Sequence, residues 1–344
     1  MNNKIDILSM TIEELSDLML SIDEKKFRSK QIYQWLHEKR VCSFNEMTNL
    51  PKVLQDKLEE KCNITKLNKI RQVKSKDGTI KYLFELNDHN VVESVLMSYK
   101  HGNSVCISSQ VGCRMGCKFC ASTIGGLERQ LLVSEMLGQV YEINRLSGKK
   151  ISNIVVMGTG EPLDNYNVLI KFIEIINSKE GMNIGARNIT VSTCGIIDKI
   201  YELAEENLQI TLAISLHAPN NTIRKTLMPV ANIYDYEQLI NACKDYIDKT
   251  KRRITFEYSL VRGVNDSKEC ALELSKVLKG MLCHVNLIPV NEISERNYRH
   301  SNKDSIYRFR DVLENNKITT TIRRELGGDI NAACGQLRRT YNKK

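Results

Sequence analysis

The sequence predicts an α/β fold: an open βα barrel of six parallel strands, with an N-terminal helical domain and a small β-hairpin extension. Three observations support this fold. Apolar residues recur at helical spacing over the first sixty residues, Asp77-Gly78 separates alternating apolar runs as in a hairpin, and short apolar runs alternate with amphipathic stretches from residue 104 onward. A doubly wound sheet would show the same alternation of strands and helices, but a cysteine-rich loop directly after the first parallel strand favours the barrel.

The first segment, residues 1–65, is expected to be a helical accessory domain. Thr11 followed three residues later by Glu14 is a capping box that begins a helix, and Pro51 suits the first turn of another. Lys and Arg residues surround Trp35, the single Trp of the chain. RNA contact is one interpretation of this domain, and ordinary packing is the other.

The rest of the chain divides into three further segments. Residues 66–99 are expected to be β-hairpin linker strands at 70–73, 81–86 and 91–97. Residues 100–300 are expected to form the barrel, with parallel strands at 104–109, 151–157, 188–192, 209–216, 254–260 and 285–289. Residues 301–344 contain a helix, a seventh strand at 318–322 and a cysteine in a loop of small residues.

Composition narrows the class of protein. The chain has 344 residues, of which 42% are hydrophobic, so it can bury one large core and large-scale disorder is not expected. Acidic residues interrupt every apolar stretch near the N-terminus, and no uncharged run reaches the length of a membrane span, so we expect a cytoplasmic protein. In that compartment the 11 cysteines are reduced, which favours metal or redox work over a disulfide scaffold.

The formal net charge of +9 has the sign that nucleic acid prefers. The excess lies in three clusters, each of which could equally be a solvated helix end. They are Lys25, Lys26, Arg28 and Lys30 near the start, Lys249, Lys251, Arg252 and Arg253 in the middle, and Arg323, Arg324, Arg338, Arg339, Lys343 and Lys344 at the end.

Three cysteines in one short loop, Cys113, Cys117 and Cys120, carry the strongest chemical signal. Three thiolates can hold three irons of a 4Fe-4S cluster and leave the fourth iron open to a small molecule. Zinc is the alternative, but a structural zinc site needs a fourth Cys or His, and only His101 and Cys106 lie near. The third interpretation, three free cysteines that only pack in the core, is disfavoured. Arg, Lys and two Gly share the loop and do not suit apolar packing.

Further candidates follow the predicted strands, where the carboxyl ends of a βα barrel place its site. They are Gly160 and Glu161 within Gly158-Thr159-Gly160-Glu161-Pro162, then Ser192, then Ser215, Leu216 and His217, and finally Asn291. Glycines let the backbone approach a ligand closely. For His217, the alternative to a ligand contact is a hydrogen-bonded histidine of the core.

Two more cysteines stand apart from the remainder. Cys106 lies on the first predicted parallel strand and could point to the same mouth as the three-cysteine loop. Cys334 lies among small residues, with Gly327, Gly328 and Gly335 marking a tightly bent segment. The others are expected to pack as small apolar residues: Cys42, Cys62, Cys194, Cys243, Cys270 and Cys283.

The cysteine spacing, with Phe119 before the last Cys, resembles the signature of radical S-adenosylmethionine (SAM) enzymes. Three motifs together resemble the RlmN/Cfr family of radical-SAM RNA methyltransferases, and within it the RlmN branch, over nearly the whole chain. They are Cys106-x6-Cys113-x3-Cys117-x2-Cys120, Gly158-Thr159-Gly160-Glu161-Pro162-Leu163 and Ala332-Ala333-Cys334-Gly335-Gln336-Leu337. Val92-Glu93-Ser94-Val95 also resembles a strand of that family.

This resemblance implies a radical-SAM partial barrel with one 4Fe-4S cluster on Cys113, Cys117 and Cys120, and two SAM molecules per turnover. It implies SAM contacts at the strand-end residues Gly160, Glu161, Ser192, Ser215, Leu216, His217 and Asn291. Cys334 would take a methyl group and become S-methylcysteine, the methyl carbon would be transferred to adenine, Glu93 would accept a proton, and Cys106 would release the product through a transient disulfide with Cys334.

The substrates implied are 23S rRNA, methylated at carbon 2 of an adenosine in the peptidyl-transferase region, and the adenosine next to the anticodon in tRNAs. The target base must leave its stack to be reached. A flavodoxin or ferredoxin reductant, a monomeric state and action before full ribosome assembly are also expected. A Cfr-type enzyme acting at carbon 8 is the nearest alternative; a zinc-bearing RNA-binding protein and a radical-SAM activase of another protein are more distant.

Overall fold

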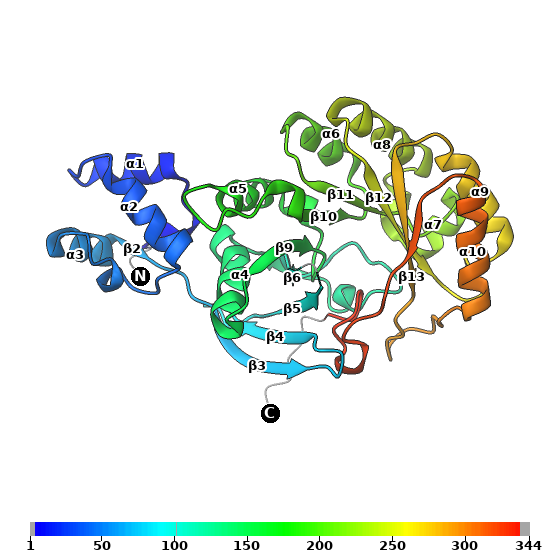
Figure 1. Ribbon diagram of the computed structural model, residues 1–344, viewed down its shortest axis with the longest axis horizontal. Helices are drawn as coiled ribbons and strands as arrows, with labels where there is room; N and C mark the ends of the chain where they lie inside the picture. Colours follow the sequence, from blue (N-terminus) through cyan, green and yellow to red (C-terminus); the bar gives the residue numbers. More distant parts are fainter. Residues whose placement is uncertain (1–3, 101, 338–344) are drawn as a thin grey trace.

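The computed structural model describes residues 4–100 and 102–337. Its framework is a ten-stranded sheet in the order β14-β13-β12-β11-β10-β9-β6-β5-β4-β3, with β14 at one edge and β3 at the other. The sheet curves into an open barrel (Figure 1), so the predicted fold class is confirmed. The seven mutually parallel strands are β6 Gly102–Ile107, β9 Ile151–Val156, β10 Ile189–Thr193, β11 Thr211–Ser215, β12 Ile254–Leu260, β13 Cys283–Pro289 and β14 Thr320–Ile322.

The predicted hairpin strands are part of the same sheet rather than a separate appendage. They are β3 Asn68–Lys74, β4 Ile80–Glu85 and β5 Val91–Tyr99, and they add antiparallel to β6. The turn between β3 and β4 contains Gly78, whose φ of 91° suits glycine. Val95 of β5 is directly opposite Cys106 of β6, so this addition places β5 side chains beside the barrel mouth.

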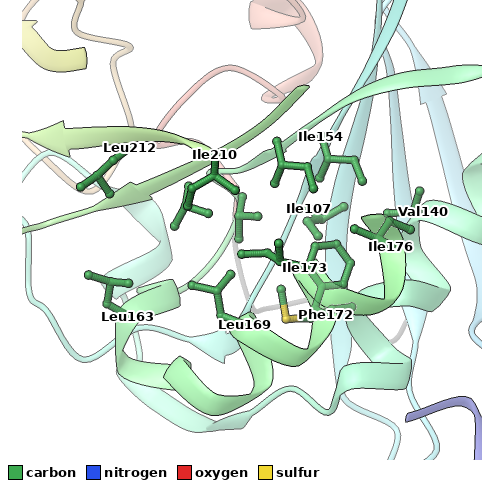
Figure 2. Packing of buried hydrophobic residues seen from close by; sticks show 14 of the residues in the cluster. Ile107, Val140, Ile154, Leu163, Leu169, Phe172, Ile173, Ile176, Ile210 and Leu212 are labelled. Atoms are coloured by element: carbon green, nitrogen blue, oxygen red, sulfur yellow. The ribbon is translucent and has the colours of Figure 1, made fainter. Parts of the chain in front are cut away.

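Helices cover the outer face of the parallel strands. They are α4 Val133–Ser147, α5 Tyr166–Asn177, α6 Ile197–Glu205, the short α7 Asn221–Leu227, α8 Tyr236–Thr250, α9 Lys268–Leu278 and α10 Lys303–Asn315. Figure 2 shows Leu169, Phe172 and Ile173 of α5 facing Ile107 and Ile154 of the sheet. All five side chains are fully buried, and burial of such a side chain contributes about 1.5–3 kcal/mol.

The N-terminal module contains α1 Ile12–Ser21, α2 Arg28–Gln34 and α3 Lys52–Lys61. The capping box of Thr11 and Glu14 is confirmed, with both of its hydrogen bonds formed. The sequence did not reveal two short strands, β1 Ile5–Asp6 and β2 Cys62–Asn63, whose parallel pairing joins the ends of the module. His37 connects the module to the barrel through a 2.9 Å hydrogen bond with the Tyr141 hydroxyl.

A small two-stranded sheet carries the loop with Cys113, Cys117 and Cys120, which we name the cysteine loop. The short strands β7 Gln110–Gly112 and β8 Leu127–Gln130 pair antiparallel, outside the main sheet, and the three cysteines lie between them. None of the helices in the described part of the chain is long and apolar enough to cross a membrane.

Candidate active site

The carboxyl ends of the parallel strands surround one cavity, which we name the strand-end cavity. Its empty space, including the open mouth, is about 930 Å³. Its lining brings together ten of the thirteen predicted site residues: Cys113, Cys117, Cys120, Gly160, Glu161, Ser192, Ser215, His217, Asn291 and Cys334.

Main-chain hydrogen bonds hold the cysteine loop against its surroundings. The N–H of Cys113 donates to the Gly126 carbonyl at 3.1 Å, and the N–H of Lys118 donates to the Leu227 carbonyl at 2.9 Å. Gly112 has a φ of 78°, and a Cβ on it would collide with the Gly126 carbonyl. The loop is therefore positioned by main-chain contacts to Gly126, just before β8, and to Leu227 of α7.

Burial decides the chemistry of the three thiols. It raises the pKa of Cys113 to about 12 and also raises the pKa values of Cys117 and Cys120, since a buried thiolate loses its hydration. The proximity of the sulfurs to one another raises the pKa values further. A bound cation is what converts such thiols to thiolates.

The number of thiols fits a cluster better than a structural zinc site. A structural zinc ion needs four protein ligands, and the cysteine loop brings three thiols to the cavity. A 4Fe-4S cluster held by three thiolates places each on a different iron and leaves the fourth iron open. Cys106 lies outside the lining of this cavity, and His101 lies outside the described residues.

The Gly160-Glu161 turn follows β9 and forms the next part of the wall. Gly160 has a φ of 112°, and a Cβ on it would meet Cβ of Gln110 at 2.6 Å. The carboxylate of Glu161 accepts hydrogen bonds from the N–H groups of Leu163 at 3.0 Å and Cys194 at 2.7 Å. Burial raises the pKa of Glu161, and these hydrogen bonds partly offset the effect. The turn thus presents backbone and a buried carboxyl group to the cavity.

His217 is both a hydrogen-bonded core residue and a cavity residue. Its Nδ1 accepts the N–H of Ser259 at 2.8 Å, so the neutral ring carries its proton on Nε2. Burial, reinforced by the cation of Arg224, lowers the pKa of His217 to about 3. The ring contacts Phe119 edge-on, with centroids 4.8 Å apart. A neutral donor of this kind suits a polar ligand without adding charge.

The remaining strand-end residues differ in their contact with the strand-end cavity. The hydroxyls of Ser192 and Ser215 are 3.5 Å apart on adjacent strands and both line the cavity. Leu216 is fully buried and is not part of the lining; its N–H donates to the Glu257 carbonyl at 3.1 Å. Asn291 follows β13, and its Nδ2 donates to the Cys334 carbonyl at 2.9 Å.

Cys334 lies on a loop, residues 327–335, that we name the carrier loop. Its side chain is exposed and lines the strand-end cavity together with the three loop cysteines. The Gly335 carbonyl accepts the N–H of Ala121 at 2.7 Å, and the Leu337 carbonyl accepts the Ser122 hydroxyl at 2.9 Å. In Figure 1 this segment, in red, returns beside the tips of β3 and β4. The carrier loop is thus attached directly behind the cysteine loop.

Cys106 faces a second cavity that adjoins the first. Its lining contains Cys106 and Cys334, and it shares Met157, Asn291, Arg323 and Cys334 with the strand-end cavity. Burial raises the pKa of Cys106 to about 12. The expectation that Cys106 shares the mouth of the cysteine loop is therefore refined: Cys334 lines both cavities, and Cys106 lines the second one.

Glu93 lies deeper, on β5, and lines neither cavity. Its Oε1 is 3.1 Å from Nζ of Lys81, and the same ammonium group donates to the carbonyl of Asn331 at 3.0 Å. Glu93 is therefore linked to the carrier loop through Lys81. The role of Glu93 as a base stays a prediction.

Sequence reasoning missed four residues around the site. Cys194, expected to be packing only, lines the cavity. Glu257 of β12 and Arg323, which follows β14, form an ion pair of 3.6 Å in its wall. Arg224 of α7 is fully buried, and its Nη2 donates to the carbonyl of Cys194. The strand-end position of Arg323 was a usable signal, whereas α7 carries no motif that points to Arg224.

The basic clusters have mixed surroundings. Lys30 pairs with Glu180 at 2.8 Å, and Nε of Arg252 donates to the Ile210 carbonyl at 2.9 Å, so both have structural partners. Arg28 lies over the ring of Phe27, with 4.8 Å from Cζ to the centroid, and the Phe27 side chain is 54% exposed. Four further cations of the C-terminal cluster lie outside the described residues: Arg338, Arg339, Lys343 and Lys344. An RNA interface on these clusters stays a prediction.

Comparisons with known proteins identify the family. Residues 5–64 match the family model "Ribosomal RNA large subunit methyltransferase N-terminal domain", and residues 107–274 match the radical SAM superfamily. A protein from Lachnoclostridium phytofermentans, named "Probable dual-specificity RNA methyltransferase RlmN", is 60% identical over 99% of this chain and 96% of its own. A relative of the same name from Lachnospira eligens is 59% identical over 98% of this chain and 96% of its own.

A solved structure agrees with these sequence matches. The crystal structure of a radical SAM methyltransferase from Sphaerobacter thermophilus superposes with a TM-score of 0.93 at 42% identity, covering 98% of this chain and 100% of that one. A 4Fe-4S cluster and SAM are the cofactors of this superfamily, and the cavity with its three thiols fits both. The chain belongs to the RlmN family of radical SAM RNA methyltransferases.

Proposed function

We propose that this enzyme methylates carbon 2 of a specific adenosine in the peptidyl-transferase region of 23S rRNA and of the adenosine next to the anticodon in tRNAs, with Cys334 as the methyl carrier. The observation that carries the proposal is that Cys334 lines the same cavity as Cys113, Cys117 and Cys120. Relatives named as dual-specificity RNA methyltransferases support RNA as the substrate, and the match to a ribosomal RNA large subunit methyltransferase domain supports ribosomal RNA.

In the first step the sulfur of Cys334 attacks the methyl group of one SAM. A carbon–sulfur bond forms on Cys334, the sulfonium bond breaks, S-adenosylhomocysteine leaves and the thiol proton passes to solvent. The exposure of Cys334 at the cavity wall supports this role, since the attacking sulfur must reach a bound SAM.

In the second step the carbon moves from Cys334 to the base. The cluster and a second SAM, when bound, supply the radical that removes one hydrogen from the methylated Cys334. The carbon on Cys334 then bonds to the adenine ring, which leaves one unpaired electron on the adduct, and Glu93 accepts the proton that the ring carbon loses. The second cavity, with Cys106 and Cys334 in its lining, supports the last bond change: the Cys106 thiol loses its proton to solvent and its sulfur bonds to the sulfur of Cys334, while the bond from Cys334 to the carbon breaks. The released carbon takes up a proton to become the methyl group, and the one remaining electron would return to the oxidised cluster.

Strand-end residues would hold SAM during both steps. Glu161 and the Gly160 backbone are placed to receive its ammonium group, and Ser192, Ser215 and Asn291 present hydroxyl and amide groups for its remaining polar atoms. Neutral His217 would donate from Nε2. Leu216 would contribute through its backbone.

Residues 1–65 and the C-terminal segment would hold the RNA by its phosphates, before full ribosome assembly. A cytoplasmic location, a monomeric state and a flavodoxin or ferredoxin reductant for the cluster complete the proposal. Two electrons and two protons from a thiol reductant would reopen the disulfide. The alternative of carbon-8 methylation is not favoured, because the relatives at 53–60% identity carry the RlmN name.

Mass spectrometry of RNA tests the product. Ribosomal RNA and tRNA from a deletion strain and from a strain complemented with this chain should differ by 2-methyladenosine. The appearance of 8-methyladenosine without 2-methyladenosine would refute the proposal.

A further inference from the structure

Arg224 is the largest fully buried side chain among the described residues, and its charge is not balanced. Its Nη2 donates to the carbonyl of Cys194, while its Nε and Nη1 have no hydrogen-bond partner. No ion pair to Arg224 occurs within residues 4–100 and 102–337. An unpaired buried cation is costly by several kcal/mol, and a guanidinium does not escape the cost by losing its proton. The positive charge of Arg224 therefore has no balancing anion among these residues.

The groups around Arg224 show where that anion is. Its Nη2 donates to the carbonyl of Cys194, and Cys194 belongs with Leu227 to the apolar shell that packs against Cys117. The charge of Arg224 also acts on the thiol of Cys117 and on the hydroxyl of Tyr236. Cys117 is one of the three loop cysteines, whereas the Tyr236 hydroxyl, itself buried without a partner, is neutral. Arg224 is not part of the lining of the strand-end cavity, so a ligand in that cavity does not touch it directly.

Helix α7 supports the cysteine loop as well as Arg224. The carbonyl of Leu227, in the last turn of α7, accepts the N–H of Lys118 at 2.9 Å. An apolar shell that includes Leu227 and Met228 packs against Cys117 and Phe119. In such surroundings the effective dielectric constant is low, and a charge close to Cys117 acts on it strongly.

We propose that Arg224 is the buried counter-charge of the iron–sulfur cluster and that it makes the cluster easier to reduce. Three thiolates give a 4Fe-4S cluster one net negative charge at rest and two after it accepts an electron. A fixed cation behind Cys117 stabilises the second state more than the first. Arg224 is thus a positioning residue: it acts on the cluster through its charge and touches neither SAM nor RNA.

The test is a potentiometric titration of the reconstituted cluster, followed by electron paramagnetic resonance without RNA. At a fixed potential, R224M should lower the ratio of reduced to oxidised cluster at least tenfold, equal to a shift of about 59 mV to more negative potential. R224K, which keeps the charge, should shift less. Y236F is the matched control, because it removes the neighbouring hydroxyl and no charge, and its potential should equal the wild-type value.

Thermal unfolding of the cluster-free proteins is the second measurement. Without the cluster, R224M removes an unbalanced buried charge, so it should unfold at the wild-type temperature or above. A wild-type potential for R224M, an equal shift for Y236F, or a cluster-free R224M that is destabilised or unfolded would each overturn the proposal. These outcomes do not depend on methyl transfer, so they leave the proposed function to its own test.

Discussion

The cysteine loop and the carrier loop form adjoining parts of one site, yet they hold their cysteines in opposite ways. The cysteine loop is fixed by main-chain hydrogen bonds to Gly126 and Leu227, and burial raises the pKa values of its thiols. The carrier loop exposes Cys334. The degree of exposure thus gives cysteine two different tasks. The buried and half-buried thiols of the cysteine loop are suited to hold metal, and the exposed thiol of Cys334 is suited to react.

The two loops also differ in what anchors them. Asp77 and Asp329 connect the carrier loop to the β3–β4 turn: the Asp77 carboxylate accepts the N–H of Gly327 at 2.8 Å, and Asp329 accepts the hydroxyl of Ser75 at 2.6 Å. The carrier loop also accepts one main-chain hydrogen bond, from the N–H of Ala121 to the Gly335 carbonyl. The comparison teaches that main-chain hydrogen bonds position the cysteine loop, whereas the carrier loop depends largely on separate side-chain contacts.

The largest effect is expected at Cys334. Cys334→Ala should retain reductive cleavage of SAM and lose methyl transfer to RNA to background, because the cleavage depends on the cysteine loop and the transfer depends on the carrier loop. Paired assays of 5′-deoxyadenosine and of labelled RNA measure both. Cys42→Ala, a half-buried cysteine in the N-terminal module, is the control. Undiminished RNA methylation in Cys334→Ala would exclude the proposed carrier.

Cys106 should separate formation of the adduct from its release. Cys106→Ala should stop the enzyme after one event, with RNA bound covalently to the carrier loop, because the sulfur that frees the product is missing. Denaturing gels with labelled RNA detect the adduct, which should vanish in the double variant with Cys334→Ala. Normal multiple turnover in Cys106→Ala would show that another group releases the base.

The Gly160 turn gives a smaller effect on binding. Gly160→Ala should weaken SAM binding ~10-fold, about 1.4 kcal/mol, since its Cβ would meet Gln110 at 2.6 Å. Gly263→Ala is a matched control: Gly263 also has a positive φ, 70°, but open space around it. Both variants bear a strain of about 1–2 kcal/mol from that backbone. Equal SAM affinities, measured by calorimetry, would remove the Gly160 turn from the site.

The smallest effect concerns the anchor of the carrier loop. Burial alone would raise the pKa of Asp77, but hydrogen bonds from Gly327 and Thr79 outweigh it and lower the pKa to about 2. A lowered pKa means that the stabilisation is fully present above the unfolded value of 3.8 and is lost as the pH falls through about 2.

Asp77→Asn should therefore loosen the carrier loop at neutral pH and reduce methyl transfer severalfold, without changing SAM cleavage. Hydrogen exchange of residues 327–335 reports the loosening, and Asp88→Asn, on the next turn of the sheet, is the control. Unchanged exchange in Asp77→Asn would mean that this anchor does not hold the loop.

Much of the fold follows from local patterns, because strand runs, the capping box at Thr11 and the turn at Gly78 are set by neighbouring residues. The three-cysteine loop and the strand-end residues could also be predicted from the sequence, because their motifs lie at the carboxyl ends of predicted strands. Pairings between distant segments were not: β1 with β2, the attachment of the carrier loop to Ser75, and the burial of Arg224 depend on tertiary packing. Burial of a single cation leaves no periodic trace in a sequence.

The measurement that tests the central claim most directly is mass spectrometry of the Cys334 peptide. Reconstituted enzyme is incubated anaerobically with methyl-labelled SAM, reductant and ribosomal RNA fragments, and the peptide and the RNA are followed over time. The account predicts that the label appears first on the sulfur of Cys334 and then on carbon 2 of adenine. Labelled RNA formed while Cys334 is never methylated would contradict it.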